Sequence, residues 1–224
     1  MTFREEFIEF MVRSKVLTFG DFTTKSGRRT PFFINTGNYR TGAQIAELGK
    51  YYAAVIHEKF GGNFEFLFGP AYKGIPLCVT AAAALWTEHR IDRAFCFNRK
   101  EAKDHGEGGM LIGHQPKDGD RAIIVEDVTT AGTSIRETVP LLEAAAKVKI
   151  AGLVVSVDRM ERGTGKKSAL AEVQETFGFP AYPIVTLADI VRHLHNRPVD
   201  GAVVLDDALR GRIEAYMKEY GPTE

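Results

Sequence analysis

The chain has 224 residues, of which 44% are hydrophobic and 26% charged, ordinary values for a globular protein with one large domain. Basic and acidic residues balance at 29 each, so no overall field favours nucleic acid or an anionic membrane. Two cysteines are too few for a disulfide framework, and no apolar stretch approaches the roughly 20 residues that cross a bilayer. The first 13 residues lack an apolar signal core. We therefore expect a cytoplasmic protein that binds neither nucleic acid nor membrane.

Helical segments and short apolar strands are expected in alternation along the chain. Phe3, Phe7, Phe10 and Met11 recur at helical spacing and predict an opening amphipathic helix, while Thr18–Gly37 indicates short strands and turns. The strands expected after it are Phe64–Phe68, Ala94–Phe97, Arg121–Val125, Ile150–Val157 and Ala181–Val185. The further helices expected are Gln44–Lys59, Ile75–Trp86, Ser134–Ala146, Lys166–Phe177, Leu187–His195 and, in the tail, Gly211–Glu224.

This alternation predicts an α/β fold, with a central, mostly parallel sheet flanked by helices. Ligands of such sheets bind at the carboxyl ends of the strands. Functional groups are therefore expected directly after Phe68, Phe97, Val125 and Val157.

The most informative of these strand ends is the segment Glu126–Ser134. Glu126 and Asp127 follow a buried strand, where two adjacent carboxylates are costly unless hydroxyls, a cation or water meet them. Small residues then lead into a helix: Val128, Thr129, Thr130, Ala131, Gly132, Thr133 and Ser134. Amides and hydroxyls at a helix N-terminus favour a phosphate, and acids suit sugar hydroxyls, so the segment fits a ribose 5-phosphate. Taken alone, an N-capped helix explains it equally well.

Cations follow two other strands. Tyr72 and Lys73 lie on the glycine-punctuated turn Gly69–Pro76, where a lysine suits a pyrophosphate or is merely solvated. The segment Asn98–Gly109 has three fixed cations, three acids, one histidine and three glycines, without helical or strand periodicity. It is either a disordered surface loop or a glycine-hinged lid that closes over an anion.

The last strand end carries Arg159, within the segment Asp158–Gly163. An arginine there can hold a carboxylate bidentately, or it can belong to a surface ion network with Asp158 and Glu161. Upstream, Pro31–Ile34 on its own is simply an apolar strand.

Taken together, five segments in this order resemble the motifs of type I phosphoribosyltransferases, and most closely those of the orotate phosphoribosyltransferases. They are Thr24–Asn35, which resembles the base-binding hood, Gly69–Pro76, which resembles the pyrophosphate turn, Asn98–Gly109, which resembles the catalytic loop, Ile123–Ser134, which resembles the phosphoribosyl pyrophosphate (PRPP) signature, and Asp158–Gly163. The resemblance spans roughly Lys15 to His195. Two departures are Glu126, where several relatives have aspartate, and Thr129, where an aliphatic residue is frequent.

The resemblance implies a single domain with the type I phosphoribosyltransferase fold, whose small N-terminal hood comes largely from about residues 1–40 and whose core comprises about 41–224. It implies transfer of the 5-phosphoribosyl group from PRPP to orotate, giving orotidine 5′-monophosphate (OMP) and pyrophosphate in pyrimidine (UMP) biosynthesis. It also implies a homodimer whose lid loop reaches the neighbouring subunit, and Mg2+ held mainly through PRPP and water, with no direct protein ligand.

The resemblance assigns roles to individual residues. Lys103 and Asp127 are the expected catalytic residues, and Phe33, Ile34, Thr130 and Arg159 the expected orotate ligands. The expected PRPP-binding residues are Lys25, Tyr72, Lys73, Arg99, Lys100, Lys103, His105, Glu126, Asp127, Val128, Thr129, Thr130, Ala131, Gly132, Thr133 and Ser134.

Three other functions fit parts of the pattern. Transfer to a purine keeps the reaction type, but Arg159 and the cationic loop argue against it. A PRPP-sensing regulator keeps the fold without the chemistry, and the intact cations and lack of a basic DNA-reading segment disfavour it. A sugar-phosphate kinase would require ATP, and Gly163–Ser168 is not a P-loop because Met160 stands where its first glycine is required.

Overall fold

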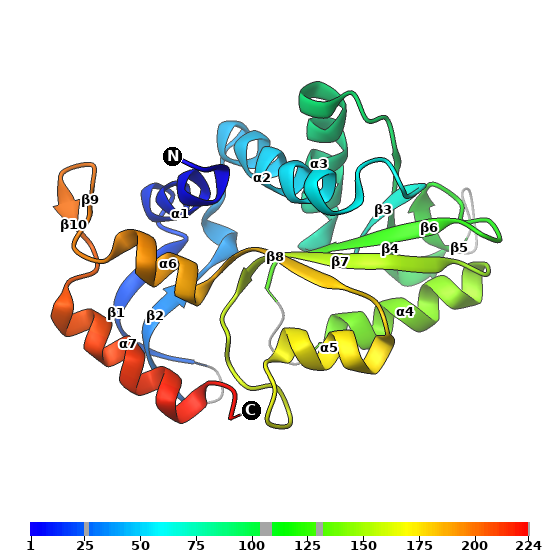
Figure 1. Ribbon diagram of the computed structural model, residues 1–224. Coiled ribbons are helices and arrows are strands. Elements are labelled where there is room, and N and C mark those ends of the chain that lie inside the picture. Colours follow the sequence, from blue (N-terminus) through cyan, green and yellow to red (C-terminus); the bar gives the residue numbers. More distant parts are fainter. Residues whose placement is uncertain (25–26, 104–108, 129–131, 224) are drawn as a thin grey trace.

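A computed structural model describes residues 1–24, 27–103, 109–128 and 132–223, with the backbone alone at 102, 103 and 133 (Figure 1). Within these residues the central sheet has six strands in the order β5-β4-β3-β6-β7-β8, and every neighbouring pair is parallel except β4 with β5, which is antiparallel. Their bounds are β3 (Phe66–Gly69), β4 (Ala94–Lys103), β5 (Gly109–Gly113), β6 (Arg121–Glu126), β7 (Lys149–Asp158) and β8 (Ala181–Thr186). The predicted mostly parallel α/β sheet is confirmed.

Helices cover both faces of this sheet, with α2 (Gly42–Phe60) and α3 (Gly74–His89) on one side and α4 (Thr133–Ala145) and α5 (Ala169–Phe177) on the other (Figure 1). The side chains of successive strand residues therefore pack in different hydrophobic clusters, on opposite faces of the sheet. Ile123 and Val125 pack in the cluster that includes α2 and α3, while Ile124 packs with α4 and α5. Each such fully buried aliphatic side chain contributes about 1.5–3 kcal/mol relative to exposure. Double-sided burial is why these strands are apolar throughout rather than alternating.

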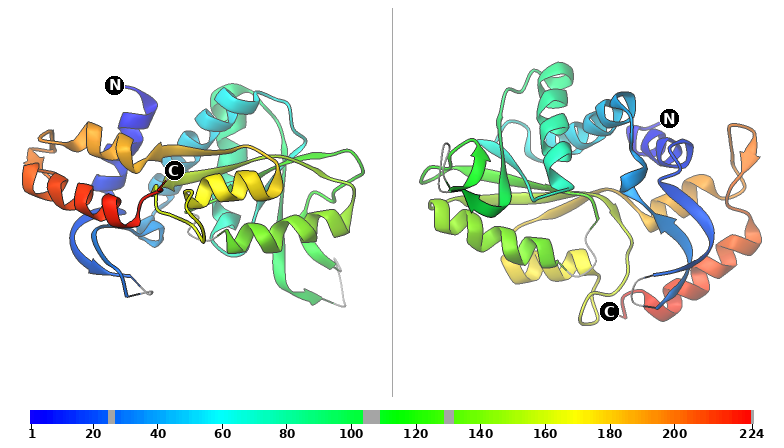
Figure 2. Two further views of the ribbon diagram at one scale, coloured as in Figure 1. Left: turned by 60° about the horizontal axis from the view of Figure 1, so that its bottom comes forward. Right: turned by 180° about the vertical axis from the view of Figure 1, so that it is seen from behind.

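A smaller lobe lies beside the sheet and draws on both ends of the chain (Figures 1 and 2). Its antiparallel hairpin consists of β1 (Leu17–Thr23) and β2 (Arg29–Ile34), within the range expected for the hood. The C-terminal helix α7 (Asp207–Tyr220) packs along β2, where the rings of Phe32 and Tyr216 meet edge to face with centroids 5.7 Å apart. The hood hairpin is thus supported by residues far beyond position 40.

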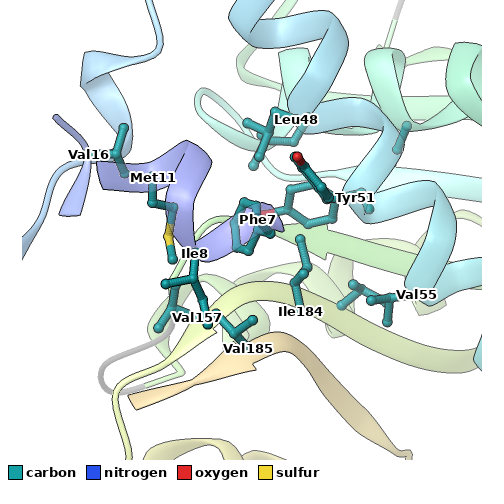
Figure 3. Packing of buried hydrophobic residues seen from close by; sticks show 14 of the residues in the cluster. Phe7, Ile8, Met11, Val16, Leu48, Tyr51, Val55, Val157, Ile184 and Val185 are labelled. Carbon is teal, nitrogen blue, oxygen red and sulfur yellow. The ribbon is translucent and has the colours of Figure 1, made fainter. Parts of the chain in front are cut away.

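The opening helix α1 (Phe3–Arg13) joins this lobe to the core. Phe7 lies between Tyr51 of α2 and Ile184 of β8 (Figure 3), and its ring centroid is 5.0 Å from that of Tyr51. A capping box formed by Thr2 and Glu5 fixes where the helix begins. Because α1 runs almost directly into β1, anchoring Phe7 also anchors the hairpin.

The remaining elements are η1 (Thr36–Asn38), α6 (Leu187–Leu194), β9 (Pro198–Val199) and β10 (Ala202–Val203). No helix in the described ranges is long and apolar enough to span a bilayer. The helices α5 and α7 begin at Ala169 and Asp207, after the side-chain caps Ser168 and Asp206, and differ by three or four residues from the expected starts.

One sequence-based expectation about the cationic segment was wrong. Residues 98–103 do not form a loop: β4 continues to Lys103, and β5 pairs with it in antiparallel register, Asn98 opposite Leu111 and Lys103 opposite Gly109. Residues 98–103 extend β4 without any apolar alternation, and their register with β5 is irregular between Asn98 and Lys103. The signal that normally reveals a strand is therefore absent from the sequence.

Candidate active site

The carboxyl ends of β3, β6 and β7 bring the predicted residues to one edge of the sheet. β3 pairs with β6, and β6 with β7, all in parallel, so the segments that follow them are neighbours. The turn after β3 meets the acid pair after β6 directly, since Lys73 Nζ lies 2.9 Å from Asp127 Oδ2. A cation predicted from one motif and a carboxylate predicted from another thus form an ion pair.

Two glycines allow the turn after β3 to fold tightly onto the start of α3. A Cβ on Gly69 would lie 2.2 Å from the carbonyl oxygen of Gly74, and one on Gly74 would lie 2.7 Å from the Cδ atom of Pro70. The Ala71 amide donates to Asn98 Oδ1 at 2.8 Å, and the peptide between Ala71 and Tyr72 is cis. On this fixed backbone Tyr72, 71% exposed, and the side chain of Lys73 project into solvent.

The side chain of Glu126 forms hydrogen bonds within its own loop. Its Oε1 accepts the Asp127 amide at 2.9 Å, and its Oε2 accepts the Ser134 hydroxyl at 2.7 Å. Burial raises the pKa of Glu126 against these hydrogen bonds, and the neighbouring charge of Asp127 raises it further. Both carboxylate oxygens are therefore engaged in linking Glu126 to Asp127 and Ser134, and the described geometry gives Glu126 a structural task.

Asp127 faces the opposite way, toward Lys73 and η1. Thr36 Oγ1 donates to Asp127 Oδ2 at 2.7 Å, and the Val128 amide donates to Oδ1 at 2.6 Å. Burial pushes the pKa of Asp127 upward, but the hydrogen bonds from Lys73 and Thr36 outweigh it and leave the pKa below its ordinary value. The Asp127 backbone carbonyl in turn accepts Ser156 Oγ at 2.5 Å. Asp127 is an ionised, firmly held carboxylate.

The phosphate-cradle part of the loop is described only in part. Gly132, at φ +67°, caps the N-terminus of α4, and a Cβ there would lie 2.9 Å from Val173 Cγ2. A glycine is therefore required on both conformational and packing grounds. The expected ligands Thr129, Thr130 and Ala131 lie outside the described residues.

The hairpin formed by β4 and β5, the cationic hairpin, borders the turn after β3. Arg99 and Lys100 lie on β4, together with Glu137 of α4 around a cavity of about 210 Å3 that also borders the turn after β3. Lys100 Nζ lies 3.7 Å from Glu137 Oε2, and Arg99 Nη1 donates to the Gly109 carbonyl at 3.3 Å. The backbone of Lys103 ends β4. His105 and Lys25 fall outside the described residues.

Arg159 is not part of a surface ion network. It is 8% exposed, its guanidinium lies 4.6 Å from the ring centroid of Phe32, and both Nε and Nη2 donate to Glu161 Oε1, at 2.9 and 2.5 Å. Phe33, the next residue along β2, stacks on Phe22 of β1. Ile34 packs against the main core. Phe32 is thus the hood aromatic that the structure brings to Arg159, because successive strand residues face opposite sides.

Sequence reasoning named Glu161 only as a surface ion partner of Arg159, and it missed Thr36, Phe32 and Tyr216. Thr36 and Phe32 contact predicted site residues, and Tyr216 contacts Glu161. Thr36 reaches Asp127 across 91 positions, and Tyr216 reaches Glu161 across 55. No local motif signals such contacts. Among the described residues no three His, Cys, Asp or Glu side chains gather as a metal site.

Known proteins share this arrangement. The family model described as "Phosphoribosyl transferase domain" matches residues 35–183. The orotate phosphoribosyltransferase of Clostridium acetobutylicum is 58% identical over 219 residues, covering 98% of both chains, and that of Lachnoclostridium phytofermentans is also 58% identical, over 98% of this chain and 97% of its own. The crystal structure of the orotate phosphoribosyltransferase of Francisella tularensis superposes with a TM-score of 0.83 at 35% identity, covering 96% of this chain and 99% of that one. The chain therefore belongs to the phosphoribosyltransferase family and, within it, to the orotate phosphoribosyltransferases.

Proposed function

We propose that the chain transfers the 5-phosphoribosyl group of PRPP to orotate, giving OMP and pyrophosphate in de novo UMP biosynthesis. The observation that carries this proposal is that the Lys73–Asp127 pair and the buried Arg159 follow the ends of neighbouring parallel strands. A cation for pyrophosphate, a carboxylate for ribose and an arginine for a carboxylated base are the three groups that this reaction needs.

Breaking the bond between C1 and pyrophosphate leaves positive charge on the ribose and negative charge on the leaving group. We assign Lys73 and, on the cationic hairpin, Arg99 and Lys100 to the pyrophosphate side, where fixed cations stabilise the charge that develops. Lys103, which follows on the same strand, is the proposed main catalytic cation. We assign Asp127 to the ribose hydroxyls and the sugar cation, because its lowered pKa keeps it ionised.

The base is selected at the end of β7. Arginine binds a carboxylate bidentately, and orotate carries a carboxylate that most nucleobases lack. We propose Arg159 as its ligand, with Phe33, Ile34 and Thr130 bordering the ring. The segment 129–134 would hold the 5′-phosphate with its amides and hydroxyls, together with Lys25, Tyr72 and His105 as further PRPP contacts.

Magnesium is compatible with the residues present. Oxygen is the ligand type that Mg2+ prefers, and PRPP itself offers many such atoms, whereas both oxygens of Glu126 and both of Asp127 already accept hydrogen bonds from the protein. We propose that Mg2+ is held mostly by PRPP oxygens and water. When bound, it would neutralise the charge of the pyrophosphate.

A homodimer in the cytoplasm is the proposed working form. Trp86 of α3 and Phe95 of β4 are 51% and 37% exposed, and these two elements pack side by side. Exposed aromatic side chains are typical of protein interfaces.

The cytoplasmic assignment rests on Cys78 and Cys96, both buried thiols whose pKa is raised to about 12 by burial.

The test is orotate consumption with PRPP and Mg2+, followed by its change in absorbance and by pyrophosphate release. Lys73→Ala and Lys103→Ala should each lower kcat by about 100-fold, the magnitude of losing one electrostatic transition-state contact. Lys50→Ala is the matched control, since Lys50 is an exposed lysine of α2 paired with Glu47. A wild-type chain that leaves orotate unchanged would exclude the function, and variants with full turnover would exclude the assigned cations.

A further inference from the structure

Three hydrogen bonds converge on one oxygen atom behind the proposed orotate site. Glu161 Oε1 accepts Arg159 Nε at 2.9 Å, Arg159 Nη2 at 2.5 Å and the Tyr216 hydroxyl at 2.7 Å. The three residues come from two distant parts of the chain, since Arg159 and Glu161 directly follow β7 and Tyr216 lies on α7. The hydroxyl of Tyr216 is therefore hydrogen-bonded to the same carboxylate that holds the guanidinium of Arg159.

This contact set determines how the guanidinium is oriented. Arg159 is 8% exposed, and a buried charge requires a counterion with good geometry, which Glu161 provides. Both bonds to Glu161 use the Nε side of the guanidinium. An arginine has five N–H donors, so the opposite edge, formed by Nη1 and the second Nη2 proton, remains available to a ligand carboxylate. Among the described residues, Glu161 is the one hydrogen-bond partner found for Arg159.

Aromatic packing covers one face of the guanidinium and leaves this edge open. The Phe32 ring covers one face of the guanidinium at 4.6 Å, and the Tyr216 ring, 5% exposed, meets Phe32 edge to face. Tyr216 thus touches both groups that confine Arg159, through its hydroxyl on Glu161 and through its ring on Phe32. The two contacts can be separated, because removing the hydroxyl leaves the ring in place.

We propose that Tyr216 and Glu161 are positioning residues that aim the free edge of Arg159 at the carboxylate of the pyrimidine, and so determine its selection over bases without one. This inference rests on the proposed function, and it adds the C-terminal helix to the substrate-selecting machinery. Neither residue touches the substrate. Their effect is on the carboxylate contact alone, and the ribose and phosphate contacts are independent of it.

The experiment compares two nucleotides that differ only by that carboxylate, OMP and UMP, by calorimetric titration of the wild-type chain and of Tyr216→Phe. The expected result is a fall of about tenfold in the ratio of OMP to UMP affinity, the worth of one hydrogen bond to a charged group. UMP and PRPP affinities should stay within twofold of the wild type. Tyr220→Phe is the matched control, since Tyr220 lies one turn further on the same helix with its ring centroid 4.8 Å from that of Tyr216.

Glu161→Asp is the second variant, which keeps the charge but withdraws it by one methylene. It should lower the same ratio, and the double variant should lose less than the product of the two single losses, because both act on one oxygen atom. An unchanged ratio in both single variants would overturn the inference, as would an equal loss of OMP and UMP. If the wild type binds OMP no better than UMP, the carboxylate assignment of Arg159 itself fails, which is a failure of the proposed function.

Discussion

Glu126 and Asp127 are adjacent in sequence, yet their surroundings push their pKa values in opposite directions. Glu126 is buried and bonded to its own loop, and its pKa is raised. Asp127 is held by Lys73 and Thr36, and its pKa is lowered. Two carboxyl groups separated in this way can divide their work. We therefore expect the first to maintain the loop and the second to meet the ribose.

Glu126→Gln tests the structural half of this division. A group whose folded pKa is raised above the ordinary value of 4.5 costs stability as pH rises through the interval between the two values. The variant lacks that cost, and its amide can still pair with Ser134 and the Asp127 amide. The Tm of the variant minus that of the wild type should therefore increase as the pH rises from 4. A Tm difference that is constant over pH 4–8 would contradict the raised pKa.

Thr36 tests the other half. Thr36→Val removes the hydroxyl that donates to Asp127 and preserves its shape. We expect kcat/KM for PRPP to fall about fivefold to tenfold, the worth of one hydrogen bond, with the KM for orotate unchanged. The acidic limb of the pH profile should move to higher pH, because the pKa of Asp127 loses one of the bonds that depress it. Thr36→Ser should restore both properties, and a profile that does not move would separate Thr36 from the ionisation of Asp127.

The strands that are buried on both faces of the sheet could be predicted from the sequence. The apolar runs of β3, β6, β7 and β8 predicted the parallel sheet, and its carboxyl edge located the turn at Lys73, the acid pair and Arg159. The edge strand β5 and the extension of β4 to Lys103 were not predictable, since residues 98–103 of β4 lack apolar alternation. Thr36 and Tyr216 were missed for another reason: their contacts depend on how whole elements pack, which no short motif encodes.

The start of α4 shows how strictly one element depends on a glycine. Gly132→Ala should destabilise the fold by about 1–2 kcal/mol from the left-handed backbone alone, with a further cost from the contact with Val173. The control is Gly211→Ala within α7, where nothing lies within 4 Å of the added Cβ, so we expect a gain of up to about 1 kcal/mol. Urea unfolding measures both. Equal changes in the free energy of unfolding for the two variants would show that the left-handed conformation of Gly132, at φ +67°, does not require glycine.

In the whole molecule the acid pair follows the central strand β6, whereas the cationic hairpin is formed by β4 and β5 at the edge of the sheet. We propose that in a dimer the hairpin of one subunit serves the site of the other. Mixing Lys103→Ala with Asp127→Asn, each nearly inactive alone, then creates heterodimers with one intact site. Activity should recover to about a quarter of the wild-type value, since half of the dimers form mixed pairs and half of their sites are intact.

No recovery after subunit exchange, with mixed dimers verified by native mass spectrometry, would place Lys103 and Asp127 of the same subunit in one site. Sedimentation of the separate variants supplies the control for assembly. A monomeric wild type would contradict the proposal at once.

The packing of α7 on β2 has a consequence for how the protein is made. Residues 207–220 are translated after every other element of the site, and domains fold progressively during synthesis. A nascent chain can therefore complete the sheet, the acid pair and the lysine turn before Tyr216 exists to reach Glu161. During biosynthesis, the ability to hold PRPP would arise before the ability to recognise orotate.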